Sequence, residues 1–188
     1  ELKLDWRVAP GGNTGVKYRV QQTVFVDPAR NPQNSRSFEA WLGHELARGL
    51  SDRKALAPGG RAQEYTVGFE LQLLDDERHP DAKRGPDRIT GALYGMLEPA
   101  RRASSVAGEW NTARVVVRGD RIEHWINGVM VLQATLSCDQ VRYAIAKRWA
   151  PAPSIRNALL APKPRGTIAL QHHGDTVWFR NIKIRMLQ

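Results

Sequence analysis

An acid and an amide stand two residues apart in a strand-like part of the sequence. In residues 65–74, apolar residues alternate with Glu70 and Gln72, so both polar side chains are expected on one face of a strand. A carboxylate beside an amide can hydrogen-bond sugar hydroxyls, and the carboxylate can also move a proton. We interpret Glu70 as a candidate catalytic base and Gln72 as a candidate substrate-binding residue. The alternative is a solvated outer face without a role.

Arg19 lies in a second strand-like segment, residues 16–25. Alternation places it opposite the apolar Val16 and Val20, on the polar face. We expect it to pair with Glu70 and to bind substrate. The alternative is a surface salt bridge worth less than about 1 kcal/mol.

Gln171 and His173 share one face near the end of a third such segment. Histidine titrates near neutral pH and can act as acid, base or metal ligand, so His173 is a candidate catalytic residue and Gln171 a candidate substrate-binding one. We predict that Glu70, Gln72, Arg19 and His173 converge on one concave surface. The alternative for His173 is a role in stabilising its turn.

Three aromatic or imidazole side chains complete the candidate set. His124 alternates with apolar residues, which fits a core histidine as well as a catalytic one. Trp125 points to the opposite face of the same strand. Trp125 and Tyr94 are candidate substrate-binding residues, because an aromatic ring can stack on a sugar.

A short loop gathers Asp75, Asp76, His79 and Asp81. Oxygen ligands with one imidazole can hold a divalent cation, although the spacing matches no EF-hand. A divalent cation is therefore a possible cofactor. A solvated acidic turn explains the same residues.

Several enzyme classes are disfavoured by missing motifs. The sequence has no Gly-x-Ser-x-Gly elbow, phosphate-binding loop or dinucleotide fingerprint. It also lacks the closely spaced carboxylates on one strand that ordinary retaining glycoside hydrolysis would use on a β-sandwich.

The elements that position these residues are short strands separated by tight turns. Turn sequences at Gly119-Asp120 and Asn127-Gly128 predict hairpins, because these residue types accept positive φ. Such a pattern predicts an all-β sandwich or barrel. The strand-like segments are residues 2–8, 16–25, 65–74, 113–118, 121–133, 167–172 and 176–186, and residues 38–50 and 140–160 read as short helical insertions.

The last strand-like segment changes parity. Val177 and Phe179 fall on one face, whereas Ile182 and Ile184 fall on the other. An extra residue reverses the alternation, so we predict a bulge near Arg180-Asn181 that turns both sets toward one core.

Charge and length bound the partners. The 188 residues carry a formal net charge of +9, but the basic residues come as singles and pairs mixed with acids. A nucleic-acid site is therefore disfavoured, and no apolar run is long enough to span a membrane. The single cysteine, Cys138, excludes an intrachain disulfide. The chain opens within a strand-like pattern, so we expect preceding residues, which could include a signal peptide, and a periplasmic or extracellular location.

Five ordered segments resemble the bacterial 3-keto-disaccharide hydrolase domain family. They begin at Gly12-Asn13-Thr14-Gly15, Gly68-Phe69-Glu70-Leu71-Gln72, Thr90-Gly91-Ala92-Leu93-Tyr94-Gly95, Gly108-Glu109-Trp110-Asn111 and Gly166-Thr167-Ile168-Ala169-Leu170-Gln171. The resemblance covers most of the chain. It implies a concanavalin A-like jelly roll, one domain over residues 1–188, and opening strands upstream of Leu2.

The resemblance also implies a carbohydrate partner and cleavage of 3-keto-glycosides by hydrolysis or elimination. A ketone at C3 acidifies the proton at C2, so one base and one oxyanion stabiliser suffice. The alternative is a carbohydrate-binding module without catalysis, because fold alone does not decide function.

Overall fold

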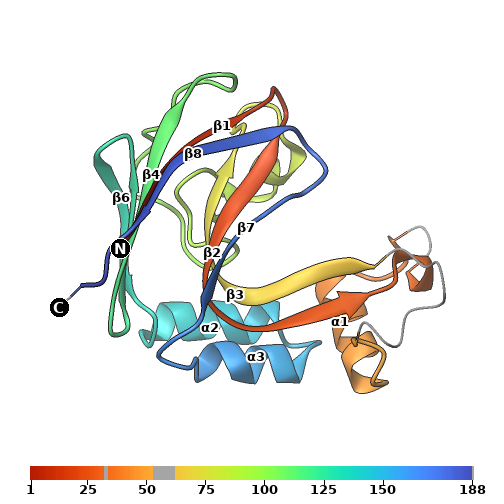
Figure 1. Ribbon diagram of the computed structural model, residues 1–188. Coiled ribbons are helices and arrows are strands. Elements are labelled where there is room, and N and C mark those ends of the chain that lie inside the picture. The colour runs from red at the N-terminus through yellow and green to blue at the C-terminus, as the bar shows by residue number, and fades with distance from the viewer. Residues whose placement is uncertain (32–33, 53–61, 188) are drawn as a thin grey trace.

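The computed structural model describes residues 1–31, 34–52 and 62–187, which fold as two antiparallel sheets with helices at one side (Figure 1). The sheet orders are β6-β5-β4-β1-β8 and β3-β2-β7. The predicted all-β sandwich, consistent with a concanavalin A-like jelly roll, is confirmed. The strands are β1 (Leu2–Val8), β2 (Asn13–Val26), β3 (Gln63–Leu74), β4 (Asn111–Arg118), β5 (Arg121–Ile126), β6 (Val129–Thr135), β7 (Thr167–Leu170) and β8 (Val177–Ile184).

Both predicted hairpins form. Gly119 has a φ of +57° in the β4–β5 turn, and Asn127 and Gly128 have φ values of +50° and +80° in the β5–β6 turn. Two successive positive φ angles are what a type I′ turn requires. The Asn127-Gly128 pair thus divides residues 121–133 into two strands.

The hydrophobic core lies between the two sheets. Leu4 and Trp6 of β1 are each 1% exposed, and Phe69 and Leu71 of β3 are fully buried. Burying a large apolar side chain of this kind contributes roughly 1.5–3 kcal/mol. Because side chains alternate along a strand, every inward residue leaves its neighbour, such as Lys3, on an outer face.

The β2–β3 pair bends where β2 carries extra residues. The register shifts between Tyr18 and Gln22, and Arg19 within this bulge has a φ of +48°. Unpaired extra residues bend a strand and turn its side chains off their alternation. Beyond the bulge, the two strands continue to the helices at the bottom and right of Figure 1.

Both predicted helical regions are confirmed. The first forms α1 (Phe38–Ala47), and the second forms two helices, α2 (Asp139–Arg148) and α3 (Pro153–Leu160). Proline suits the first turn of a helix, where its missing N–H has no partner to lose, and Pro153 begins α3. In the part of the chain that the structure describes, no helix is long and apolar enough to cross a bilayer.

The predicted bulge in β8 is confirmed, with a different consequence for burial. Lys3 pairs with Lys183 and Asp5 with Arg180, so β8 has one residue more than β1 at this point, and Asn181 has a φ of +52°. The bulge returns Ile184 to the face of the buried Leu2. Ile184 nevertheless remains 66% exposed, because β8 is an edge strand of its sheet.

Candidate active site on the three-stranded sheet

The face of the three-stranded sheet that is turned away from the core gathers several of the predicted polar residues. Glu70 and Gln72 of β3 lie opposite Lys17 and Gly15 of β2. Beyond Gly15, the Gln171 N–H donates to the Gly15 carbonyl at 2.9 Å, which continues the row across the sheet. Paired residues on neighbouring strands project from the same face. We call these five residues the polar face.

Glu70 is the acid of the polar face. It is only 6% exposed, and its Oε2 lies 3.7 Å from Lys17 Nζ. Within the described residues its carboxylate accepts no hydrogen bond. A Cβ at position 15 would collide with Glu70 Oε1, so glycine makes room for the carboxylate. A buried carboxylate with free lone pairs is suited to accept a proton.

Lys17 is held on three sides. Its Nζ donates to the Thr66 carbonyl at 2.9 Å and lies 3.9 Å from the centre of the Tyr65 ring, in addition to its approach to Glu70. A buried ammonium is stable only when such partners replace water. The geometry therefore fixes a positive charge next to the candidate base.

Buried amide groups flank Gly15. Gln72 is 1% exposed, and its Oε1 makes no hydrogen bond to the described residues; the same holds for Gln171 Oε1 and for Oδ1 of the buried Asn13. A buried acceptor without a donor costs about 1–3 kcal/mol. Sugar hydroxyls supply donors of the required kind, so the amides fit the predicted substrate-binding roles of Gln72 and Gln171.

Tyr94 lies on the other side of Glu70, where its N–H donates to the Glu70 carbonyl at 3.0 Å. Its hydroxyl donates to Asp81 Oδ2 at 2.6 Å and accepts from Arg88 at 2.7 Å. Burial raises the pKa of Tyr94, so the phenol stays protonated. The guanidinium groups of Arg88 and Arg148 lie 5.0 and 4.7 Å from its ring centre. The Tyr94 backbone thus lies beside Glu70, and its hydroxyl and ring already have partners, so its role in substrate binding stays a prediction.

Arg148, at the end of α2, links the helices to Tyr94. Its Nη1 donates to the Tyr94 carbonyl at 3.0 Å, and its Nε donates to Glu39 Oε1 at 3.0 Å. Gly95 has no side chain to obstruct it, since a Cβ there would lie 2.5 Å from Arg148 Nη1. The contact positions the helical insertions against the edge of the polar face.

Arg19 does not join Glu70, so the predicted pairing is wrong. Its Nη2 donates to the Gly119 carbonyl at 2.5 Å, in the turn between β4 and β5 of the other sheet. The left-handed backbone of Arg19 within the bulge reverses its side-chain direction.

His124 is a core histidine, and its predicted catalytic role is not supported by its position. It is fully buried, with Nε2 2.8 Å from the Tyr18 hydroxyl and Nδ1 3.0 Å from the Gly91 carbonyl. Burial lowers the pKa of His124 to about 4, so the ring is neutral. Both nitrogens are occupied and neither reaches the polar face.

Trp125 lies on the outer face of the five-stranded sheet, away from Glu70, which corrects its predicted place at the site. Its Nε1 donates to Glu123 Oε2 at 3.0 Å, and the Arg114 guanidinium lies 3.9 Å from its ring centre. Alternation gave the correct face of the strand, but the strand belongs to the other sheet.

His173 lies in the exposed turn between β7 and β8, two residues beyond Gln171. It makes no hydrogen bond or ion pair within the described residues. The neighbouring Asp175 accepts from the Asn13 N–H at 3.0 Å, which holds this turn beside the start of β2. The predicted convergence of His173 with Glu70 therefore stays a prediction.

The structure shows no cluster of cation ligands in the acidic loop. No group of three or more potential side-chain ligands of the His, Cys, Asp or Glu types assembles among the described residues. Asp75 instead accepts backbone N–H groups from Gly11, Glu77 and Arg78. Burial raises the pKa of Asp75, but these hydrogen bonds outweigh burial and hold it below its usual value. The loop carboxylates serve turns and ion pairs.

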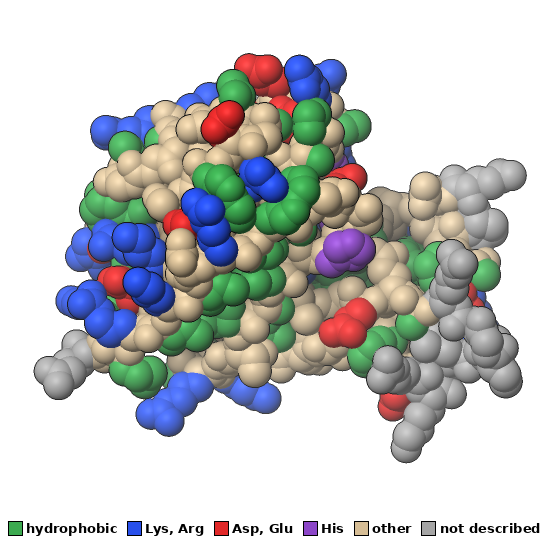
Figure 2. All heavy atoms as spheres, turned by 45° about the horizontal axis from the view of Figure 1, so that its top comes forward, with side chains coloured by type: hydrophobic (Ala, Val, Ile, Leu, Met, Phe, Trp, Pro, Cys, Tyr) green, Lys and Arg blue, Asp and Glu red, His purple; other side chains and the backbone are tan. Residues whose placement is uncertain are grey.

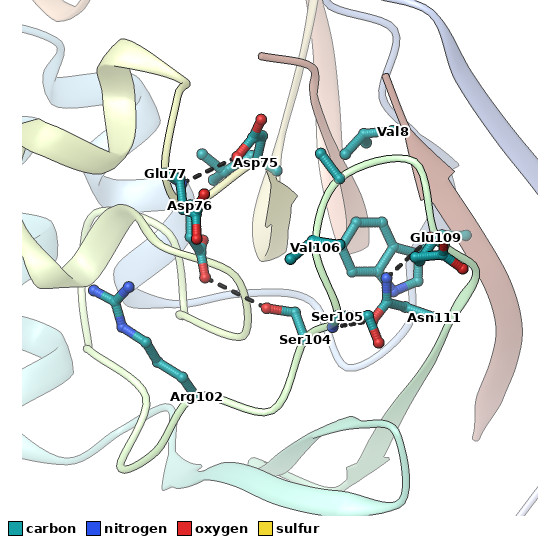
Figure 3. A pocket seen from close by; sticks show the side chains of 13 residues that line it. Val8, Asp75, Asp76, Glu77, Arg102, Ser104, Ser105, Val106, Glu109 and Asn111 are labelled. Carbon is teal, nitrogen blue, oxygen red and sulfur yellow. Dashed lines mark hydrogen bonds between the residues drawn. The ribbon is translucent and has the colours of Figure 1, made fainter. Parts of the chain in front are cut away.

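A hollow of about 160 Å³ opens at one end of the sandwich, between the turn at Asp75–Glu77 and the loop before β4 (Figure 3). Asp76 and Glu77 line one side, and Ser104, Ser105 and Glu109 line the other. Asp76 accepts from the Thr90 N–H at 2.7 Å, so it is already engaged. None of the five residues of the polar face lines this hollow.

A family model described as "3-keto-alpha-glucoside-1,2-lyase-like domain" matches residues 1–185. The chain belongs to this family.

Curated and solved relatives agree with the assignment to the 3-keto-alpha-glucoside-1,2-lyase-like family. A protein of Bacteroides thetaiotaomicron named 3-keto-disaccharide hydrolase is 30% identical over 195 residues, which cover the whole chain but 58% of that protein. Two crystal structures of proposed glycosyl hydrolases from Parabacteroides distasonis have TM-scores of 0.64 and 0.54 at 23% identity. The matched regions cover 96% and 99% of this chain, and 66% and 77% of the two solved chains. These structures show a shared fold.

Sequence reasoning missed three residues of this family member's candidate site. Lys17 stood in the same alternation as Arg19, and its place two residues after Gly15 was the available signal. Asn13 stood in the turn-like segment before it. Arg148 carried no local signal, because its contact with Tyr94 spans 54 positions in the sequence.

Proposed function

We propose that this domain cleaves 3-keto-glycosides, with Glu70 as the base that removes the proton at C2. The observation that carries the proposal is the buried Glu70 carboxylate, 3.7 Å from the Lys17 ammonium and beside unpaired amide oxygens on one sheet face. Family membership and the relative named 3-keto-disaccharide hydrolase support this substrate class.

The chemistry follows from the ketone. The C3 carbonyl acidifies the C2–H bond, and Glu70 takes that proton while the electron pair passes to the carbonyl oxygen as an enolate. The enolate then re-forms the ketone and a C1–C2 double bond as the C1–O bond breaks. The leaving alkoxide takes a proton from water, and the hydroxide so formed takes back the proton held by Glu70. Addition of water across the double bond would complete a net hydrolysis.

Lys17 is suited to stabilise the enolate. A fixed positive charge in a site with little water acts strongly on charge that develops in the transition state. Gln72 and Gln171 would hold hydroxyl groups of the sugar from either side of Gly15. In this arrangement the protein supplies one base, one electrophile and two orienting amides.

A one-base mechanism agrees with the composition of the polar face. Ordinary retaining hydrolysis needs two carboxyl groups roughly 5–5.5 Å apart. Glu70 is the one carboxylate among the five residues of the polar face, and its charged neighbour is a lysine. The arrangement suits proton abstraction beside a carbonyl better than double displacement.

The test compares a matched pair of substrates. Purified protein is given 4-nitrophenyl glucoside and its 3-keto derivative, and release of nitrophenolate is followed, with spontaneous elimination subtracted. We expect turnover of the 3-keto compound alone. Equal rates on both substrates, or sugar binding without turnover, would favour an ordinary glycosidase or a carbohydrate-binding module instead.

A further inference from the structure

A row of cations crosses the outer face of the five-stranded sheet. Lys3 of β1 lies directly opposite Lys183 of β8 on one side and Arg114 of β4 on the other, and Arg114 in turn lies opposite Trp125. The intervening Leu2 and Leu4 face the core, so the row faces outward. We call Lys183, Lys3 and Arg114 the cation row.

Such a row is electrostatically unfavourable unless something offsets it. Neighbouring strands are about 4.8 Å apart, so the three positively charged side chains leave the backbone within about 10 Å of one another. Like charges directly opposite each other across strands destabilise a sheet. None of the three makes an ion pair within the described residues.

The nearby carboxylates have partners of their own. Asp5 accepts from Asn181 at 2.7 Å and from Arg180 at 3.2 Å, and these bonds, with the charge of Lys3, hold its pKa low. Glu1 pairs with Arg185, and Glu123 accepts from Trp125 and pairs with Arg121. Lys3 thus acts on Asp5 without an ion pair, and no carboxylate among the described residues forms an ion pair with the cation row.

The surface at the row is hollowed and partly rigid. A hollow of about 170 Å³ is lined by Lys3, Thr112, Ala113, Arg114, Trp125 and Gly128. The Arg114 guanidinium lies 3.9 Å from the Trp125 ring centre, and the indole N–H is fixed by Glu123. One charge of the row is therefore positioned before a ligand arrives.

We propose that the cation row binds the carboxylate or sulfate groups of an acidic polysaccharide. Lysine and arginine bind both anions by charge-assisted hydrogen bonds, and arginine binds them in a bidentate manner. Figure 2 shows Lys and Arg side chains gathered at the left of the molecule, with a few acidic side chains among them. The proposal does not depend on Glu70, because the row lies on the other sheet.

Nucleic acid is the less suitable polyanion for this face. Non-specific binding of single strands uses aromatic rings on which bases stack. The tryptophans of this face already stack with guanidinium groups: Arg114 with Trp125, Arg7 with Trp178 at 4.1 Å, and Arg180 with Trp110 at 3.9 Å. Their rings are engaged, whereas the ammonium groups of Lys3 and Lys183 are free for anions.

The experiment compares two triple variants of equal charge. The row variant is Lys3→Gln, Arg114→Gln, Lys183→Gln; the control is Lys83→Gln, Lys147→Gln, Arg165→Gln on other surfaces. Binding to polygalacturonate, heparin, dextran, an oligothymidylate and anionic lipid vesicles is measured across a salt series. We expect the wild type and the control to bind polygalacturonate, heparin or both, but not dextran. The row variant should bind the same polysaccharide with at least about tenfold lower affinity, and its affinity should depend less steeply on salt.

Three results would overturn the proposal. These are equal binding by the two triple variants, no binding of either acidic polysaccharide by wild type, and tighter binding of oligothymidylate or vesicles than of both. The two acidic polysaccharides separate carboxylate from sulfate as the bound group. Turnover of a neutral 3-keto-glucoside should be the same in the row variant and the wild type. A failure of the polysaccharide-binding test would therefore leave the proposed role of Glu70 intact, and the reverse also holds.

Discussion

Glu70 and Lys17 face each other across the β2–β3 pair, with 3.7 Å between Oε2 and Nζ and almost no solvent exposure of either side chain. A buried pair of this kind is costly to assemble, since both ions lose hydration. Its place beside unpaired amides on the same face indicates a functional reason for it beyond a contribution to stability. Substitution of Glu70 and of Lys17 separates the effect of the pair on catalysis from its effect on stability.

Replacing Glu70 with glutamine should abolish proton abstraction while keeping the shape of the site. We expect Glu70→Gln to lower kcat on a 3-keto-glucoside by about 10²- to 10⁴-fold, with little change in sugar affinity. Glu64→Gln, at an exposed position of the same strand, is the matched control and should leave the rate unchanged. A Glu70→Gln protein with normal turnover would remove Glu70 as the base.

Removing one ion of the pair should destabilise the fold more than removing both. Lys17→Met leaves the Glu70 carboxylate buried without a counter-charge, which typically costs about 3–5 kcal/mol in the free energy of unfolding. The double variant Lys17→Met, Glu70→Gln should be more stable than Lys17→Met alone. Urea unfolding at pH 7 measures all four proteins of this cycle, and strictly additive losses would show that the two groups do not interact.

Gly15→Ala tests whether the room next to Glu70 matters. The added Cβ would collide with Glu70 Oε1, so the carboxylate must move. We expect at least a tenfold loss of kcat/KM, because small displacements of a catalytic group are costly. Gly11→Ala is the control: its φ of +74° carries a backbone cost, but nothing lies within 4 Å of its Cβ. Equal activity of the two variants would contradict the proposed geometry.

His124 should make the fold sensitive to mild acid. Burial lowers its folded-state pKa to about 4, below the usual 6.5, so the unfolded chain binds a proton that the folded chain refuses. Its contribution is fully present above pH 6.5 and is lost as the pH falls toward 4, by about 3 kcal/mol in total. Urea unfolding at intervals between pH 7 and 4 measures this slope. His124→Gln should be less stable at pH 7 but should lack that part of the slope, and an unchanged slope would contradict the assignment.

Much of the fold follows from local pattern. Alternation and turn residues predicted the strands, the Asn127-Gly128 hairpin and the β8 bulge, because these features depend on neighbouring residues. The same local logic placed Glu70 and Gln72 on one face. Alternation predicted the face of a side chain correctly wherever the strand was regular.

The rest depended on contacts that no local pattern contains. Arg19 was misplaced because an arginine with positive φ in a bulge has no distinctive sequence signal. Trp125 was assigned the correct face of its strand but the wrong sheet, since alternation does not tell which of two layers a strand joins. The partner of His124, Tyr18, is 106 positions away, and only the folded chain reveals it.

The place of β1 has a consequence for how the chain folds. Among the described strands β1 comes first along the chain, yet it pairs with β4 on one side and with β8, which comes last, on the other. Proteins dominated by such distant pairings fold slowly, because a long loop loses its freedom before any pairing compensates. During synthesis, the five-stranded sheet must wait for β8 to emerge, and until then β1 has an open edge. The open edge of β1 therefore favours aggregation until β8 is made.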